Sequence, residues 1–464
     1  MEDVISTINE YLAGYVLIIL LIGAGLWFTF RTRFVQLRCL GEGFRNMFSG
    51  NKAQGEDGLT SLQSVSTAIA AQVGTGNVVG AADAILVGGP GAIFWMWVIA
   101  FFGMATSYAE TVLAIQTRQR DVAGDYLGGP VFYIREAFGE RWGRWLAAFF
   151  AFALILALGF AGAMVQANAV SGAVAQAFGT PTWVAGAVLV VLCALIFLGG
   201  IQRIGAVAVR IVPVMGALFL GGGLVVLVMR AQYVPDAFAM IFRCAFQPQS
   251  IIGGTFGYAI MKAITQGARR GLFSNEAGMG STPHAHAQAN VPTPHYQGTI
   301  AMVGVFVDTF VVLTINALII ISTLYAVDGP LHAGLTDALA ETYTRNNLSA
   351  MGFGTALGEQ VGSLIVAVSL VFFAFTSILG WNAYGRVNAI YLFGGKSRQR
   401  LRWCVGLYTL GCLVFIFAGS VAKSSIVWQL SDFFNYLMVF PNIPAMLVLT
   451  AWVVRASREK NKCK

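Results

Sequence analysis

Hydrophobic stretches of roughly 20 residues recur along the whole chain and are separated by short segments that hold most of the charged residues. A helix of about 20 apolar residues crosses the hydrocarbon core of a bilayer, which is about 30 Å thick. A soluble protein has no core that buries so many segments that are apolar on every face. We therefore predict an all-α polytopic membrane protein with about 11 transmembrane helices. The expected spans are 13–30, 60–87, 91–117, 146–177, 182–200, 205–229, 250–273, 298–326, 355–392, 401–419 and 426–454.

The distribution of basic residues predicts how these spans are oriented. We place the loop after the first span in the cytoplasm and alternate the sides from there. Every lysine and arginine then falls on the cytoplasmic side except Arg230, Arg243, Arg345 and Lys423. Such an excess is the positive-inside rule, and it accounts for the net charge of +8 without a nucleic-acid partner. We expect a multi-pass protein of the cell (cytoplasmic) membrane, with the N-terminus outside and the C-terminus in the cytoplasm.

The order of the spans predicts an internal repeat preceded by one extra helix. Acidic residues (Glu2, Asp3 and Glu10) precede the first span, whereas a cleaved signal peptide begins with a basic region, so we expect this span to remain. The other spans divide into two blocks of five, which are inverted relative to each other because five is odd. The predicted parts are 1–58 (extra helix and cytoplasmic loop), 59–230 and 231–454 (the two five-helix repeats) and 455–464 (basic cytoplasmic tail). We also expect a short re-entrant or surface helix within 327–353.

A cluster of glycines interrupts the span 60–87 near its middle. Gly74, Gly76 and Gly80 alternate there with Thr75 and Asn77. Transporters use such clusters to break a helix, so that free N–H groups face a substrate carboxylate and free carbonyls face a cation. The alternative is close packing of helices through small residues. The polar neighbours Asn77 and Gln72 favour the broken helix.

A second glycine cluster, Gly253–Gly257, lies near the start of span 250–273, which continues through Lys262 and Gln266. Broken segments at corresponding positions of two repeats indicate a binding site between them. The two clusters occupy the first helix of each predicted block. The sequence therefore predicts a second broken helix that begins at this glycine cluster.

Several polar residues lie within apolar spans, where they are costly and tend to face the interior of the bundle. For Glu110 and Asp308 we favour an internal pair or a gating contact over a proton relay. A substrate contact and a helix–helix contact are both open for Gln166. The adjacent hydroxyls of Thr376 and Ser377 either bond to their own helix or complete a sodium shell. Further examples are Asn168, Asn316 and Asn382.

Cysteines and histidines do not predict a metal site. The six cysteines show no CxxC spacing, and several lie in apolar spans, so a disulfide framework is not expected. His284, His286 and His295 lie close together after the sixth helix of the expected bundle, without a third ligand at suitable spacing. We interpret this segment as a solvated loop.

Four segments resemble one transporter family. Residues Gly88–Gly103 (GGPGAIFWMWVIAFFG) resemble the signature of the alanine/glycine:cation symporters, also called sodium:alanine symporters, over its whole length. Val73–Asn77, Gly271–Gly278 and Ile378–Gly385 are similar to that family as well. The resemblance implies a LeuT-type fold, with a five-plus-five inverted repeat preceded by one extra helix. It also implies sodium-driven uptake of alanine or glycine by alternating access.

The resemblance further implies which residues bind the substrate and the ion. The amides of Thr75 and Gly76 are expected to hold the substrate carboxylate. The polar wall is implied to consist of Gln72, Asn77 and Gln166, and the apolar wall of Phe256, Gly257, Ile260 and Trp381. The implied sodium ligands are the carbonyls of Ala70, Val73 and Phe373 and the hydroxyls of Thr376 and Ser377.

We therefore expect a sodium-coupled symporter that imports a small neutral amino acid and has no organic cofactor. A proton-coupled or exchanging transporter on the same fold, or one specific for serine or glutamine, is the nearest alternative. Glu110 and Asp308 are its only candidate proton carriers within the predicted spans. The spans hold no Ser/His/Asp or metal triad, so we do not expect an enzyme. A channel is less consistent with broken helices, which suit an occluded site. The expected partners are the amino acid, sodium and membrane lipid.

Overall fold

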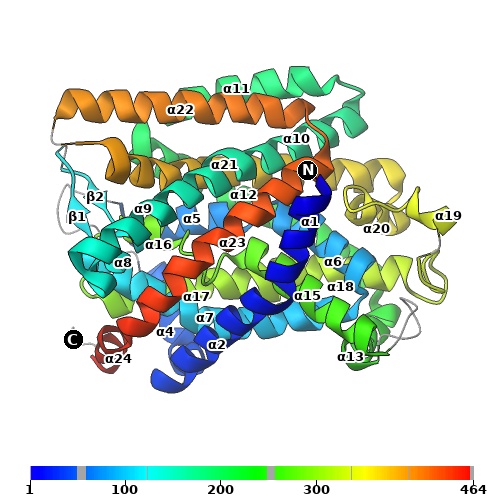
Figure 1. Ribbon diagram of the computed structural model, residues 1–464. Helices are drawn as coiled ribbons and strands as arrows, with labels where there is room; N and C mark the ends of the chain where they lie inside the picture. Colours follow the sequence, from blue (N-terminus) through cyan, green and yellow to red (C-terminus); the bar gives the residue numbers. More distant parts are fainter. Residues whose placement is uncertain are drawn as a thin grey trace.

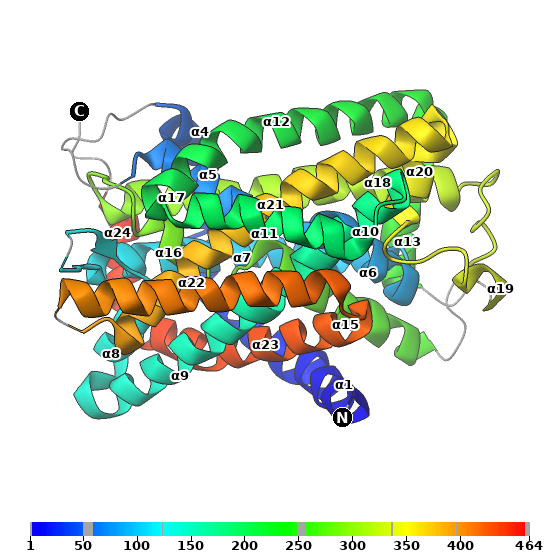
Figure 2. The ribbon, with the colours of Figure 1, turned by 90° about the horizontal axis from the view of Figure 1, so that it is seen from above.

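The computed structural model describes residues 2–49, 59–122, 124–247, 256–335, 337–395 and 397–459. Nearly all regular structure in this part of the chain is helical, and a two-stranded antiparallel ribbon of β1 (Gln119–Arg120) and β2 (Tyr126–Leu127) is the exception. The long helices run along a common direction, and α1 and α24 lie toward opposite ends of it (Figures 1 and 2). This is the architecture of a helical membrane protein, as the apolar spans predict.

Each predicted span has a helical counterpart. The N-terminal part comprises α1 (Glu2–Tyr11), η1 (Leu12–Leu17), α2 (Ile18–Arg31), α3 (Val35–Arg38) and α4 (Leu40–Phe48). The first block comprises α5 (Ser61–Gln72), η2 (Gly76–Gly80), α6 (Ala81–Gly88), α7 (Gly91–Thr117), α8 (Pro130–Phe138), η3 (Gly139–Gly143), α9 (Arg144–Leu154), η4 (Ile155–Gly162), α10 (Ala163–Phe178), α11 (Thr182–Phe197) and α12 (Gly200–Met229). The second block comprises η5 (Ala231–Tyr233), α13 (Val234–Phe246), α15 (Phe256–Asn275), α16 (Pro283–His286), α17 (Pro294–Val305), η6 (Phe306–Leu313), α18 (Thr314–Leu324), α19 (Asp337–Ala340), α20 (Leu348–Leu357), α21 (Glu359–Phe393), α22 (Arg398–Val421), α23 (Ser424–Val448) and α24 (Thr450–Arg458).

Length and hydropathy agree with a protein that crosses the membrane many times. Six helices in the described part of the chain are long and apolar enough to span a bilayer, or up to eight if each bent pair counts as one span. One bent pair joins Ser61–Gln72 to Gly76–Gly88 at 43°. Shorter apolar helices, among them Ile18–Arg31 and Thr182–Phe197, occupy further predicted spans. The short helices α19 and α20 occupy the stretch in which we expected a surface or re-entrant helix.

The packing of the helices has the symmetry of two five-helix blocks. Leaving out the N-terminal part, α7 packs on α17, α10 on α21, and α11 on α22. When the ten spans are counted from the bent span α5–α6, these contacts join the second span to the seventh, the third to the eighth and the fourth to the ninth. Each contact therefore joins corresponding spans of the two blocks, and exchange of the blocks leaves the set of contacts unchanged. The same exchange maps the contact of α12 with α21 onto that of α23 with η4. The fold is thus the predicted five-plus-five arrangement, preceded by one extra helix.

The extra helix packs against both blocks. Its first half, α1, lies against α23, where the Asn9 amide donates to the Gln429 carbonyl at 2.9 Å. Its second half, α2, packs on α7, and α4 packs on α17. The N-terminal part is therefore attached to the bundle along its whole length.

The helix α15 corrects two expectations from the sequence. Arg269 and Arg270, which we counted with Lys262 on the cytoplasmic side although they fall within the span 250–273, lie inside this helix, and Arg270 is buried. They are therefore no evidence for the orientation of the chain. The predicted opening at Gly253–Gly257 falls largely outside the described residues, and α15 is continuous from Phe256 to Asn275. The backbone opens instead over 276–282, where Glu276, Gly278 and Gly280 have φ values of 57°, 87° and 79°.

Candidate substrate and ion site

The break in the first helix of the bundle lies where the glycine cluster predicts it. The helix α5 begins with a capping box at Thr60 and ends at Gln72, and Val73 leaves the helical conformation with ψ 88°. A Cβ atom on Gly74 would overlap the Ser377 hydroxyl, and one on Gly76 would lie 2.9 Å from the Ser274 Cα. The glycines therefore serve both alternatives raised by the sequence: they open the helix and they let α21 and α15 approach it.

The side chain of Asn77 holds the break in shape. Its Oδ1 accepts the Gly74 N–H at 3.1 Å, and its Nδ2 donates to the Asp308 carboxylate at 2.8 Å. The Asn316 amide in turn donates to the Asn77 carbonyl at 2.9 Å. Asn77, expected in the polar wall, thus ties the break to η6 and α18.

A buried carboxylate lies beside this break. Asp308 accepts hydrogen bonds from Asn77, from the Ser274 hydroxyl at 2.9 Å and from the Thr309 hydroxyl at 2.9 Å. All four residues are fully buried. The expected internal contact of Asp308 is therefore present. Ser274 was missed as a site residue, although it lies in the Gly271–Gly278 motif, whose Ser-Asn-Glu run in an apolar stretch was a usable signal.

The second polar group gathers oxygen atoms from α5 and α21. The Ser377 Oγ lies 3.1 Å from the Ala70 carbonyl and 3.0 Å from the Phe373 carbonyl, and the Thr376 Oγ1 lies 3.0 Å from the same Phe373 carbonyl. Val73 caps α5 at this level. These are the residues predicted to bind sodium, and the structure brings Ala70, Phe373, Thr376 and Ser377 together. Neutral oxygen donors at the negative end of a helix dipole suit a small hard cation.

Unpaired polar atoms surround the amide groups of the break. The Thr75 N–H donates to the Gln166 Oε1 over a long 3.4 Å, while the Thr75 hydroxyl and the Gln166 Nε2 have no partner among the described residues. Gln72 lies on the opposite side, where its Nε2 donates to the Asn275 carbonyl and its Oε1 is unpaired. Buried polar groups are normally satisfied, so such a set indicates a place where a polar ligand binds.

The aromatic wall differs from the predicted one. Phe273 packs against Gly76, and its ring meets that of Trp381 edge to face at 6.0 Å. Trp381 is thus near the break. Residues 256–260 form the first turn of α15, whereas Gly88, at the far end of α6, already packs on Ala263 and Gln266. The structure therefore places Phe256, Gly257 and Ile260 about 20–25 Å along α15 from Phe273, and the residues of α15 beside the break are Phe273 and Ser274.

A carboxylate on α7 holds the open segment between α15 and α16. The Glu110 oxygens accept the Gly278 N–H at 3.2 Å, the Gly280 N–H at 2.9 Å and the Asn442 amide at 2.6 Å. These contacts satisfy the N–H groups that the unwound backbone leaves free. Glu110 thus makes internal contacts, and these contacts hold the open segment against α7.

Charged residues close the bundle on the α6 side of the break. Arg270 donates to Asp83 at 2.7 Å and lies 3.4 Å from Asp432, while Arg269 donates to Asp432 at 2.8 Å. Arg270 also lies over the Trp428 ring, which packs on Phe273. We name Asp83, Arg269, Arg270 and Asp432 the ion lid. It joins α6, α15 and α23 next to Trp428, which packs on Phe273 of the aromatic wall.

The three clustered histidines correct the expectation of a solvated loop. His284, His286 and His295 are at most 4% exposed. Each bonds to a residue of the bundle: His284 to Asn388 at 2.8 Å, His286 to Gln297 at 2.9 Å and His295 to Tyr108 at 2.7 Å. The segment between α15 and α17 is therefore packed into the protein.

His295 also lies beside Cys39 and Glu42 of the N-terminal part, with their potential ligand atoms within 4.8 Å of one another. Sequence spacing gave no sign of this group, because its members are far apart in the chain. Arg31, Arg33 and Arg38 line the same hollow. Their positive charge opposes the binding of a cation there.

A helical bundle with a broken helix, neutral oxygen groups, a buried carboxylate and unpaired polar atoms at one enclosed place is a secondary membrane transporter. The comparison with known families agrees. The chain belongs to the sodium:alanine symporter family, whose profile matches residues 1–464. It is therefore a sodium-coupled amino-acid symporter by family, and it is not an enzyme.

Individual relatives cover the full length of the chain. The sodium/alanine symporter AgcS of Methanococcus maripaludis is 39% identical over 465 residues, which cover 100% of this chain and 98% of that protein. The probable sodium/glutamine symporter GlnT of Bacillus subtilis is 36% identical over 468 residues, which cover 100% of this chain and 91% of that protein. Among solved structures, a manganese transporter of Eremococcus coleocola aligns with a TM-score of 0.49 and 14% identity, over 84% of this chain and 76% of that one.

Proposed function

We propose that this protein imports alanine or glycine together with sodium by alternating access. The observation that carries the proposal is the break at 73–75, around which the Thr75 hydroxyl and the Gln166 Nε2 are buried without a partner among the described residues. The N-terminal end of the helix that follows the break offers N–H groups and a positive dipole end to a carboxylate. The relative named as an alanine symporter, which covers the whole chain, supports the substrate class.

The amino acid binds between the break and the aromatic wall. Its carboxylate takes the N–H groups of Thr75 and Gly76 and displaces the long bond from Thr75 to Gln166. Gln166 then turns its amide to the carboxylate, while Asn77 and Gln72 keep the backbone in place. The side chain faces Phe273, Ser274 and Trp381. Because Gly76 already touches Phe273 and Ser274, a large side chain would overlap this wall, which restricts the substrate to a small residue.

Sodium binds at Ala70, Val73, Phe373, Thr376 and Ser377. The ion takes the carbonyl oxygens to which the two hydroxyls donate in this structure, and the hydroxyl oxygens become ligands as well. Binding there joins the end of α5 to α21 and orders the break for the substrate. One sodium ion that enters with the membrane potential gains about 2.3 kcal/mol per 100 mV. That free energy concentrates the amino acid in the cell.

The proposed orientation places the C-terminus in the cytoplasm and the ion lid on the outer side. Basic residues at or near the ends of the expected spans, among them Arg118, Arg398, Arg402 and Arg455, lie on the inner side in this arrangement. The repeats 59–230 and 231–454 then form the two inverted halves. Opening of the ion lid admits the substrate, and its closure encloses the site seen here.

Uptake of radiolabelled alanine into liposomes that contain the purified protein tests the function. We expect accumulation with an inward sodium gradient and none with equal choline, and we expect glycine but not leucine to compete. Accumulation driven by a proton gradient alone would refute sodium coupling and direct attention to Asp308. Competition by glutamine as strong as that by glycine would refute the small substrate and favour the specificity suggested by the relative named as a glutamine symporter.

A further inference from the structure

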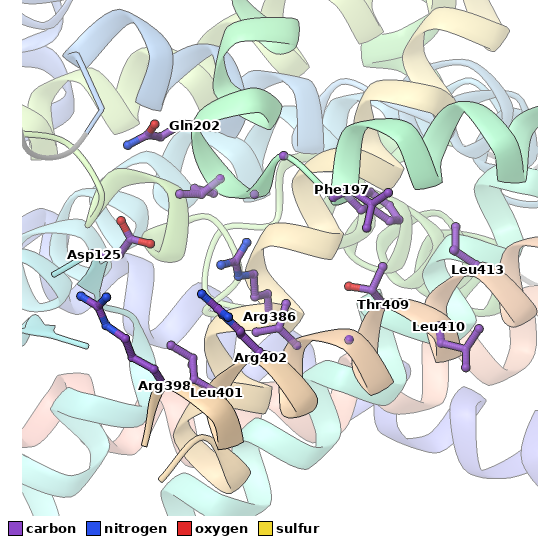
Figure 3. Close-up of a pocket in the computed structure, with 16 residues that line it drawn as sticks. Asp125, Phe197, Gln202, Arg386, Arg398, Leu401, Arg402, Thr409, Leu410 and Leu413 are labelled. Atoms are coloured by element: carbon purple, nitrogen blue, oxygen red, sulfur yellow. The ribbon is translucent and has the colours of Figure 1, made fainter. Parts of the chain in front are cut away.

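A large hollow lies at the periphery of the bundle, away from the helix break. Its volume is about 840 Å³, and it is lined by the corner between α11 and α12, by Arg386 of α21 and by the first half of α22. Arg386 is about 13 Å further along α21 than Ser377. The hollow therefore does not belong to the substrate and ion site. Figure 3 shows the residues that line it.

One end of the hollow is positively charged. Arg386, Arg398 and Arg402 line it together, and among the described residues Asp125 is the one acidic residue of the lining (Figure 3). Arg398 and Arg402 are four residues apart on α22, so they lie on one face of the helix. Gly200, at φ 68°, lets the chain turn close to Arg386: a Cβ atom there would lie 2.9 Å from the guanidinium. The corner between α11 and α12 is thus shaped around this arginine.

The other end of the hollow is apolar and faces the lipid. Leu410, Leu413 and Phe197 line it, and the stretch from Val405 to Leu413 spans about 12 Å of helix. Leu198 and Leu410 are 81% and 59% exposed, on the outer surface of a bundle that lies in the bilayer. A soluble anion would make no favourable contact with this apolar wall, whereas an acyl chain can pack against it.

We propose that this hollow binds an anionic phospholipid, with the phosphate among Arg386, Arg398 and Arg402 and an acyl chain along Val405–Leu413. The planar guanidinium groups match a phosphate in charge and geometry. The placement requires that the arginines lie at the level of the headgroups, which the proposed cytoplasmic position of the N-terminal end of α22 provides. Basic hollows between helices at that face are where acidic headgroups bind.

Native mass spectrometry of the full-length protein in detergent tests the proposal, with phosphatidylglycerol and phosphatidylcholine as probes. The variant carries Arg398→Gln and Arg402→Gln. The control carries Arg45→Gln and Arg141→Gln, which remove the same charge from exposed residues of the same face outside the hollow. At about 1 kcal/mol per arginine, we expect the test variant to bind phosphatidylglycerol about thirtyfold more weakly. The control keeps the affinity of the unchanged protein.

Three results would overturn the proposal. The first is equal weakening in the test and control variants, which would show attraction to the whole basic face. The second is that phosphatidylcholine binds as tightly as phosphatidylglycerol and that the test variant loses affinity for both lipids to the same extent. The third is glycerol phosphate that displaces the lipid at concentrations equal to those of the lipid itself, which would make the site one for a free phosphate ester. Melting temperatures of both variants verify that each is folded.

Discussion

The Ser377 hydroxyl lies 3.1 Å from the Ala70 carbonyl oxygen, although 307 residues separate them in the chain. This contact joins the last turn of α5 to the middle of α21, and the proposed sodium ion binds between them. Replacement of Thr376 and Ser377 by alanine removes two of five ligands. We expect the sodium concentration for half-maximal alanine uptake to rise at least about tenfold, which corresponds to about 1.4 kcal/mol.

The control for this change is Ser369→Ala, because Ser369 is a buried hydroxyl on the same helix without a partner among the described residues. It should leave the sodium requirement unchanged. If the sodium requirement of the double variant is unchanged as well, the assignment of the sodium site to Thr376 and Ser377 is wrong.

Gly74→Ala tests the close approach of α5 and α21. The added Cβ atom overlaps the Ser377 hydroxyl, so one of the two helices must shift. Overpacking of this kind costs about 1–3 kcal/mol, and we expect a lower melting temperature together with loss of sodium-dependent uptake. Gly216→Ala, in the middle of α12 where nothing lies within 4 Å of the new atom, is the matched control and should retain both. Normal transport by Gly74→Ala would show that the break tolerates a wider spacing.

Asp308→Asn tests the carboxylate beside the break. Asp308 accepts from three donors, and an amide in its place turns an N–H₂ group toward at least one of them. We expect alanine uptake to fall at least about tenfold, because the amide cannot accept from Asn77 on one side and from Ser274 and Thr309 on the other at the same time. Asn77 keeps its contact with the Asp308 main-chain carbonyl, so the change acts on the side-chain contacts alone. The exposed Asp236→Asn on α13 serves as the control for charge. Uptake that stays at the unchanged level would exclude Asp308 from the site.

We expect the ion pairs of the ion lid to stabilise the closed state of the transporter. Asp432→Asn leaves the partly buried Arg269 and the buried Arg270 with less negative charge around them, which destabilises closure on that side. We expect faster hydrogen–deuterium exchange of the amides of residues 74–80 in protein reconstituted into nanodiscs. Asp328→Asn breaks another arginine–aspartate pair, with Arg230, outside the lid and should leave this exchange as it was. Equal exchange in both variants would mean that the lid does not control access.

Glu110→Gln tests the anchor of the open segment between α15 and α16. The amide retains one acceptor where the carboxylate offers two, so either the Gly278 or the Gly280 N–H loses its partner. A buried unpaired N–H costs about 1–3 kcal/mol, and we expect the melting temperature to fall and the rate of uptake to decrease. Glu136→Gln, on α8 and away from this segment, should change neither quantity. A stable and fully active Glu110→Gln protein would show that Asn442 alone suffices.

Local sequence signals predicted one of the two open segments and missed the other. The break at Gly74–Gly76 was predictable because glycines and polar residues coincide in the middle of an apolar span. The opening at 276–282 depends on Glu110 and Asn442, which are far from it in the sequence. Nothing in the glycine pattern distinguishes that opening from the cluster at Gly253–Gly257. The position of Phe273 beside the break likewise follows only from the packing of α15 against Gly76, whereas the polar run Ser274-Asn275-Glu276 was a local signal for Ser274.

The histidines illustrate the same limit. A polar segment between two apolar spans is consistent with a loop in water, and only a tertiary structure supplies the partners Asn388, Gln297 and Tyr108 that make burial favourable. Spans and their order follow from composition along the chain. Contacts between helices distant in sequence do not.

In the proposed sodium site, the Ala70 and Val73 carbonyls come from the end of α5, whereas the Phe373 carbonyl and the two hydroxyls come from α21. Neither helix supplies all five oxygen atoms, so binding of the ion at this site would depend on the alignment of the two helices. A slide of one helical turn, about 5.4 Å, would separate the two halves without breaking a hydrogen bond within either helix. In the proposed mechanism, such a slide would be sufficient to release the ion, and both helices could stay rigid.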